Sequence, residues 1–245
     1  WHHRRSELHL PGNGVDGRKG HPIGNHRVVA PTDDADAQSV VGCGRAVTGE
    51  RIAIVDPNTL ARLGPRLNAE RESPLAITLV QALASADKMD WVVQKAVELG
   101  VAAIQPVAAE RSVLKLSGDR ADKRRAHWQQ IAVSACEQSG RNRVPEVAEI
   151  LPLAKYLAQD FAGTRMILAP GAEGALARKP RPAGPVAILI GPEGGWSPAE
   201  LALADRAGCE PLALGPRVLR TETAGLAAIA AMQTLWGDFP GDLDV

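Results

Sequence analysis

The chain has 245 residues, enough to bury a substantial core in one large or two small domains. Only 3% of the residues are aromatic, so the core must be aliphatic. The 28 basic and 28 acidic residues cancel, which excludes the overall basic excess that is typical of nucleic-acid binders, so any surface of that kind must be local.

The cysteine and histidine patterns favour a protein without a bound metal. Cys43, Cys136 and Cys209 are widely spaced and form no CxxC or Cys/His pattern, so we expect a reduced, cytoplasmic protein without structural zinc. We interpret the adjacent His2 and His3 as incidental. No apolar stretch reaches the roughly 20 residues that span a bilayer, so we expect no membrane association.

The first 70 residues or so differ from the rest in composition. Gly, Pro, Asp, Arg and His dominate through residue 50, and the one clear strand candidate lies at residues 51–55. Asn13-Gly14 and residues 31–34 are typical of turns. This region is therefore expected to be separate from the part that follows.

From residue 74 onward, short apolar runs alternate with longer helical patterns, which predicts an open parallel sheet of five or six strands. Strands are expected at residues 76–81, 103–107, 165–169, 186–190 and 212–214, and helices at 88–99, 120–139 and 223–237.

The helix expected at residues 88–99 has a charged face and an apolar face. We interpret Lys88, Asp90, Lys95 and Glu98 as solvated side chains rather than site residues, with Trp91, Val92, Ala96 and Leu99 in the core. Trp128 and Trp196 are of a type that stacks on bases or on a cofactor, but packing in the core or an interface is favoured for both.

A glycine-rich loop follows the strand expected at residues 186–190. Glycines at 191, 194 and 195 allow the backbone to approach a ligand closely, and valine at Gly194 is expected to fill the space that the ligand needs. Ser197 and Glu200 form the pattern of a helix N-cap, with Pro198 in the first turn. The pattern predicts strand, loop and helix.

A second loop follows the strand expected at residues 212–214. Gly215-Pro216 ends that strand, and Arg217, Arg220 and a Thr-Glu-Thr cluster precede a helix of small, apolar residues. A helix of this composition must be buried on most sides, in the core or in a subunit interface. Ligands of open parallel sheets bind beyond the carboxyl ends of the strands, where both loops begin.

The chain resembles the RsmE family of 16S ribosomal RNA uridine-N3 methyltransferases, which belongs to the SPOUT class. Four segments carry the resemblance in the family's order within residues 74–240: residues 88–101, 135–145, 190–196 and 214–224.

The resemblance implies an α/β fold of the SPOUT type, with a deep C-terminal trefoil knot and a small N-terminal PUA-like β-barrel that grips RNA. On this basis residues 1–72 are the expected RNA-binding domain and 73–245 the methyltransferase domain. The N-terminal region lacks the expected succession of strands. It is therefore a divergent barrel, a partly disordered segment or a segment whose sequence is altered.

The resemblance also implies S-adenosylmethionine (SAM) as the cofactor and a homodimer as the active form, without a metal. The residues that the family pattern places at the cofactor are Leu168, Ala169, Gly191, Glu193, Gly194, Gly195, Leu214, Gly215, Leu219, Thr221 and Ala224.

The implied reaction needs a way to remove the proton from uridine N3, because the neutral ring nitrogen is a poor nucleophile. A cation beside the uracil carbonyls favours the N3 anion, and Arg141 and Arg220 are the candidates. Glu222 or Glu193 is the candidate base, with the alternative that the carboxylate only holds a loop or the cofactor. For Arg141 the alternative is a phosphate contact.

Small-subunit 16S ribosomal RNA is the expected partner, contacted by Arg111, Lys115, Arg143 and Arg217. Two other readings stay open. One keeps the fold with a different target, such as a ribose 2′-oxygen or another base in ribosomal or transfer RNA. The other is a ribosome-binding or assembly protein without catalysis.

Overall fold

The computed structural model describes residues 43–45, 51–56, 59–62, 71–172 and 174–240. Strands β1 (Cys43–Arg45), β2 (Arg51–Asp56) and β3 (Thr59–Arg62) form an antiparallel sheet in the order β1-β2-β3. The strand expected at residues 51–55 is confirmed as β2. His2, His3, Asn13-Gly14 and residues 31–34 lie outside the described residues, and the barrel as a whole stays a prediction.

The main sheet is parallel, as predicted, in the order β10-β8-β9-β4-β5-β6, with β7 beside β5. Its strands are β4 (Ile77–Ala82), β5 (Ala103–Ala108), β6 (Glu146–Val147), β7 (Leu151–Pro152), β8 (Thr164–Leu168), β9 (Val186–Ile190) and β10 (Glu210–Leu212). The sequence did not predict β6 and β7, because a strand of two residues has no periodicity. The strand expected at 212–214 lies two residues earlier, where it pairs with β8.

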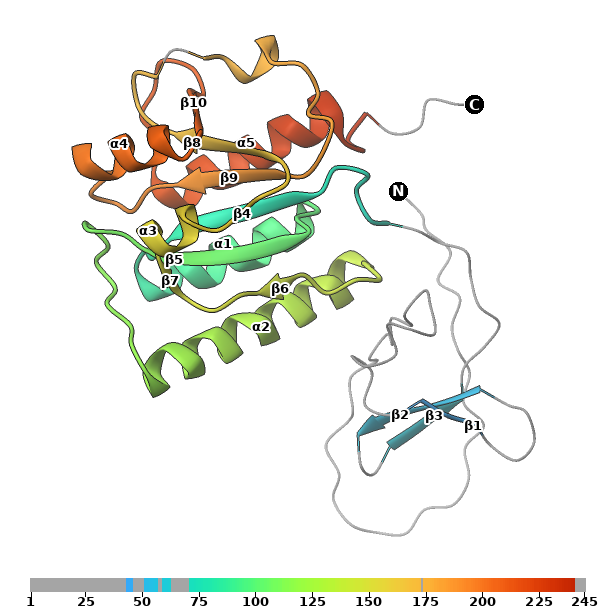
Figure 1. The fold of residues 1–245 in the computed structure, drawn as a ribbon. Helices are drawn as coiled ribbons and strands as arrows, with labels where there is room; N and C mark the ends of the chain where they lie inside the picture. The colour runs from blue at the N-terminus through green and yellow to red at the C-terminus, as the bar shows by residue number, and fades with distance from the viewer. Residues whose placement is uncertain (1–42, 46–50, 57–58, 63–70, 173, 241–245) are drawn as a thin grey trace.

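Helices cover both faces of this sheet (Figure 1). One face carries α1 (Ala86–Glu98), α2 (Asp119–Ser139), α5 (Thr221–Trp236) and the short 3-10 helix η2 (Leu176–Arg178). The other face carries α3 (Leu153–Leu157) and α4 (Pro198–Arg206). Among the described helices, none combines the length and the apolar character that a membrane span requires.

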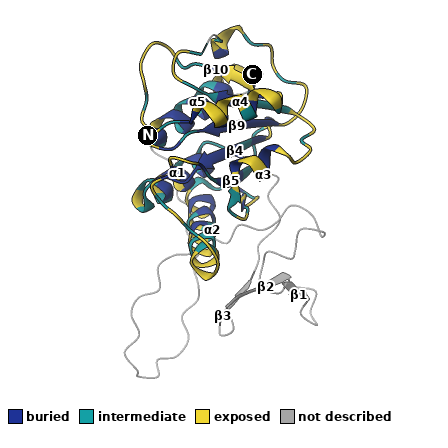
Figure 2. Cartoon of the chain, turned by 60° about the vertical axis from the view of Figure 1, so that its left-hand side comes forward, coloured by how far each residue is buried: buried dark blue, intermediate teal, exposed yellow. Residues whose placement is uncertain are grey.

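Strand β9 is buried on both faces, as its uninterrupted apolar sequence predicted. Val186, Ile188 and Ile190 pack into the cluster with α1 and α5, while Ala187 and Leu189 pack into the cluster with α3 and α4. Figure 2 shows β9 and its neighbour β4 in the buried centre of the main sheet, with β9 buried along its whole length. The aliphatic core expected from the composition thus lies in two layers, one on each side of β9.

Helix α5 lies very close to the sheet because its second turn contains glycine. A Cβ atom at Gly225 would lie 3.3 Å from Cγ1 of Ile190 in β9 and 3.4 Å from Cδ1 of Leu79 in β4. Farther along the helix, Ile229 and Met232 are fully buried. This confirms that the small-residue helix is a core element within this chain.

The prediction that Trp91 is a core residue is wrong. Its side chain is 52% exposed, because Met89, Val92 and Val93 occupy the buried face of α1. The ammonium of Lys95 lies 5.1 Å from the centroid of the Trp91 ring. Trp128, in contrast, is fully buried, and its indole N–H donates to Oδ1 of Asp90 at 3.0 Å, so this helix pair is joined by a polar contact as well as apolar ones.

Arg141 lies in a buried ion pair at the end of α2. Gly140 ends the helix in the left-handed conformation, with φ of 74°, and the chain then turns back toward α1. The guanidinium of Arg141 donates to Oε2 of Glu72 and to the carbonyl oxygens of Val97 and Val101, at 3.0 and 2.9 Å.

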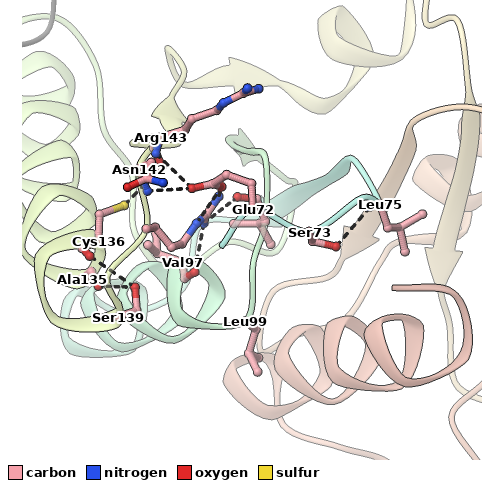
Figure 3. Close-up of polar contacts among 12 residues, drawn as sticks. Glu72, Ser73, Leu75, Val97, Leu99, Ala135, Cys136, Ser139, Asn142 and Arg143 are labelled. Carbon is pink, nitrogen blue, oxygen red and sulfur yellow. Dashed lines mark hydrogen bonds and ion pairs between the residues drawn. The ribbon is translucent and has the colours of Figure 1, made fainter. Parts of the chain in front are cut away.

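Glu72 also accepts hydrogen bonds from the backbone N–H groups of Asn142 and Arg143, both at 3.0 Å (Figure 3). The ion pair therefore joins the segment before β4 to the ends of α1 and α2. Arg141 is only 5% exposed, and its guanidinium is directed to this junction.

Replacing Arg141 with alanine is expected to lower the free energy of unfolding by about 3 kcal/mol, because it removes one partner of a buried charge pair. Urea denaturation measures this change. A variant of unchanged stability that binds ligand normally but has lost activity would contradict this structural role and restore the catalytic one.

Candidate functional site

A pocket opens where the carboxyl ends of β8, β9 and β10 meet at one edge of the sheet. It encloses about 450 Å³. The loop after each of these strands contributes to it, and the start of α5 closes it. The lining residues are Lys88, 168–172, 190–193, 195, 196, 212–221 and 224. The position beyond the strand ends is the one that open parallel sheets use for ligands.

The first loop, after β9, is held by the start of α4. The hydroxyl of Ser197 accepts from the backbone N–H of Glu200 at 3.3 Å, and Oε2 of Glu200 accepts from the N–H of Ser197 at 2.8 Å. The predicted capping box is therefore confirmed, with Pro198 in the first turn. Gly195 has φ of 67°, a conformation that allows the loop to turn before the cap.

Trp196 connects the first loop to the loop after β8. Its indole N–H donates to the carbonyl oxygen of Leu168 at 3.1 Å, and the side chain is 7% exposed. The ring also lies against Gly191, where a Cβ atom would be 3.3 Å from it. Trp196 thus forms a pocket wall and fixes the distance between two of the loops.

Thr221, the first residue of α5, connects the first loop to the sheet. Its hydroxyl donates to the carbonyl oxygen of Gly191 at 2.6 Å and accepts from Nε2 of Gln81 at 2.9 Å. Gln81 is fully buried in β4, and its Nε2 also donates to the carbonyl oxygen of Ala82. This hydrogen-bonded chain holds the start of α5 and the glycine loop at a fixed separation.

The rim of the pocket carries two carboxylates and a lysine. Nζ of Lys88 lies 3.4 Å from Oε1 of Glu193 and 3.3 Å from Oε2 of Glu222. Desolvation acts to raise the pKa of Glu193, but hydrogen bonds from the Ser85 backbone and from Lys88, together with the charge of Lys88, lower it below its ordinary value. Glu193 is therefore an anion near neutral pH.

Most of the predicted cofactor residues line this pocket: Leu168, Ala169, Gly191, Glu193, Gly195, Leu214, Gly215, Leu219, Thr221 and Ala224. Gly194 does not. A Cβ atom there would lie 2.9 Å from Cβ of Arg111, so the space that this glycine leaves is occupied by the chain after β5 and is not available to a ligand.

The predicted charged residues are divided between the pocket and other places. Arg217 and Arg220 line the pocket. Glu222 is not a lining residue, but it forms an ion pair with Lys88, which is one. Arg141 is not among the lining residues, because its guanidinium is engaged by Glu72 and two carbonyl groups.

The remaining RNA candidates are exposed. The guanidinium of Arg111 donates to the carbonyl oxygen of Gly194 at 3.2 Å, which places it against the first loop. Lys115 lies on the same segment and donates to the carbonyl oxygen of Glu110 at 3.1 Å, whereas Arg143 lies at the end of α2 beside Glu72.

Sequence reasoning missed two features of the site. It assigned Lys88 to a solvated helix face, and it gave no role to Gln81, which lies near the carboxyl end of the mainly apolar strand β4. A buried glutamine one strand from the glycine loop is a signal for Gln81, because a polar side chain in a central strand needs a partner. For Lys88 the sequence holds no comparable signal, since its contacts come from two distant segments.

Neither Cys136 nor Cys209 is activated. Burial raises the pKa of Cys136 to about 11, and burial also raises the pKa of Cys209, so both remain protonated thiols near neutral pH. Within the described residues, no three His, Cys, Asp or Glu side chains gather in a way that would hold a metal ion.

The sequence matches a known protein family and is similar to curated proteins. Residues 71–233 match the RNA methyltransferase domain family. The ribosomal RNA small subunit methyltransferase E of Buchnera aphidicola subsp. Schizaphis graminum is 39% identical over 170 residues, 68% of each chain, and that of Bacillus subtilis is 36% identical over 174 residues, 67% of this chain and 68% of the other.

The fold agrees with a solved relative. The crystal structure of the Neisseria gonorrhoeae ribosomal RNA small subunit methyltransferase E, bound to S-adenosyl methionine, superposes with a TM-score of 0.71. It is 46% identical, over 78% of this chain and 79% of that one. The chain therefore belongs to the ribosomal RNA small subunit methyltransferase E family of RNA methyltransferases.

Proposed function

We propose that this protein is a SAM-dependent methyltransferase that methylates N3 of a uridine in the 16S ribosomal RNA of the small subunit. The observation that carries the proposal is the pocket itself. Its three loops leave parallel strands at one edge, in a chain whose relative of the same family is a SAM complex.

The residues of the pocket fit SAM. Its volume of about 450 Å³ lies in the range of roughly 300–1,000 Å³ found for sites of small molecules and cofactors. Leu168, Leu214, Leu219 and Trp196 supply an apolar wall, as an adenine ring requires, and Glu193 supplies a carboxylate for hydroxyl or amino groups. When bound, SAM supplies a methyl group on a cationic sulfur, which is the electrophile of the reaction.

The protein's own task is to align the uracil ring and to remove its N3 proton. Arg220 lines the pocket, and its permanent charge beside a uracil carbonyl favours the N3 anion. Glu222 follows two residues later at the pocket rim, where its carboxylate takes the proton. Methyl transfer to the ring nitrogen is then an in-line displacement that needs alignment and no metal.

The RNA is expected to reach the pocket across an exposed basic surface. Arg217 at the pocket, Arg111 against the first loop and Lys115 on the neighbouring segment are assigned to phosphate contacts, with Arg143 farther away. We further propose a PUA-like RNA-binding domain at residues 1–72, a SPOUT domain with a trefoil knot at 73–245, and a homodimer that acts on small subunits in the cytoplasm.

The proposed function is tested by transfer of labelled methyl from SAM to undermodified small ribosomal subunits, followed by nucleoside analysis of the RNA. The expected product is 3-methyluridine. A methyl group on a ribose 2′-oxygen or on another base contradicts the assignment of the target atom, and SAM binding without any transfer contradicts the assignment of an enzyme.

Replacing Arg220 with alanine is expected to lower kcat about a hundredfold while SAM affinity stays within a factor of about two, because the guanidinium acts on the uracil and not on the cofactor. Steady-state kinetics and calorimetry separate the two effects. An equal loss of SAM binding and of kcat would place Arg220 on the cofactor side instead.

Replacing Thr221 with valine keeps the shape of the side chain and removes both hydrogen bonds of its hydroxyl. The dissociation constant of SAM is expected to rise about tenfold, because the glycine loop loses its link to β4 through Gln81. Thr221→Ser retains the hydroxyl and is the matched control. Equal affinities of the valine and serine variants for SAM in calorimetry would exclude this role of the hydroxyl.

A further inference from the structure

The beginning of α1 contacts both halves of the pocket rim. Nζ of Lys88 lies 3.4 Å from Oε1 of Glu193, in the loop after β9, and 3.3 Å from Oε2 of Glu222, in the first turn of α5. The backbone N–H of Ser85, just before α1, donates to the same Oε1 of Glu193 at 3.1 Å. Three segments far apart in the sequence therefore meet at one ammonium group.

The buried position of the Glu222 carboxylate is stabilised by its contact with Lys88. The side chains of Lys88, Glu193 and Glu222 are only 26%, 25% and 20% exposed. Oε2 of Glu222 is shielded from solvent, and no hydrogen-bond donor of the described residues reaches it, so the ammonium of Lys88 is its charge partner there. A shielded carboxylate oxygen without a cation is unfavourable, and without Lys88 the side chain would turn toward water.

We propose that Lys88 is a positioning residue for methyl transfer, which ties Glu222 to Glu193 and so holds the Glu222 carboxylate at the pocket rim. The proposal rests on the proposed function, in which Glu222 takes the N3 proton. It gives α1 a part in the site beyond its packing against the sheet. The lysine chain is long enough to place its ammonium 3.4 Å from one carboxylate and 3.3 Å from the other, so its charge acts on both.

The arrangement is also balanced electrostatically. Two carboxylates in proximity repel each other, and one ammonium between them removes most of that repulsion. Of the described residues, Arg217 and Arg220 are the other charged groups that line this pocket. Removal of the Lys88 charge is therefore expected to raise the pKa of Glu193, which Lys88 helps to lower.

The test uses three variants of the full chain. Lys88→Met removes the charge and keeps the chain length, Lys88→Arg keeps the charge, and Lys95→Met is the matched control. Lys95 lies on the same helix and pairs with Glu98 at 2.8 Å, and it is not a pocket residue. Four quantities are measured: kcat and KM with undermodified small subunits, the SAM dissociation constant by calorimetry, and the carboxyl titration of 13C-labelled glutamates in the free protein by NMR.

Lys88→Met is expected to lower kcat at saturating SAM about tenfold through misplacement of Glu222, with KM for small subunits within a factor of about two. The titration of the free protein should show a higher pKa for Glu193. Lys88→Arg should restore most of kcat, and Lys95→Met should match the wild type in every measurement.

A normal kcat in Lys88→Met would overturn the proposal, as would an arginine variant as slow as the methionine variant or an equal loss in Lys95→Met. A wild-type protein that binds SAM and transfers no methyl group contradicts the proposed function instead. In that case an unchanged Glu193 titration in free Lys88→Met also refutes the Lys88 contact, and a raised one supports it.

Discussion

The burial of β9 on both faces is the constraint on which the rest of the structure depends. The side chains of five consecutive apolar residues in a strand point to both faces of the sheet, and all of them are buried only if helices cover both faces. Helices α1 and α5 on one side and α3 and α4 on the other are therefore required together. Parallel pairing to β4 and β8 then brings the carboxyl ends of these strands to one edge. The loops of the pocket meet there because the core is built in this way.

The shape of the pocket is maintained by hydrogen bonds that connect its loops to one another and to the sheet. Trp196 connects the loop after β9 to β8, and Thr221 connects it through Gln81 to β4. Each contact joins segments that are distant in the sequence, and each uses a backbone carbonyl or a buried amide. These contacts fix the loops relative to one another, while Arg217 and Arg220 at the pocket are exposed.

Much of the fold was predictable from local patterns. The strands expected at 76–81, 103–107 and 186–190 are short, mainly apolar runs, and Ser197 with Glu200 marks a helix start, because strands and caps depend on neighbouring residues. The roles of Arg141 and Lys88 were not predictable in this way. One side chain is engaged by Glu72 and the other by Glu193 and Glu222, and no local pattern specifies a partner about 70 to 130 residues away.

The absence of net charge in this chain is compatible with an RNA substrate because some basic side chains are paired with carboxylates inside the protein and others are exposed at the pocket. Arg141 is neutralised inside the protein by Glu72, and the partly exposed Lys88 is shared by two carboxylates, so both charges are balanced within the protein. Arg217 and Arg220, in contrast, are exposed at the pocket. A count of basic and acidic residues treats these four side chains alike, whereas only the exposed pair has no carboxylate partner among the pocket-lining contacts and matches the proposed contacts with an anionic substrate.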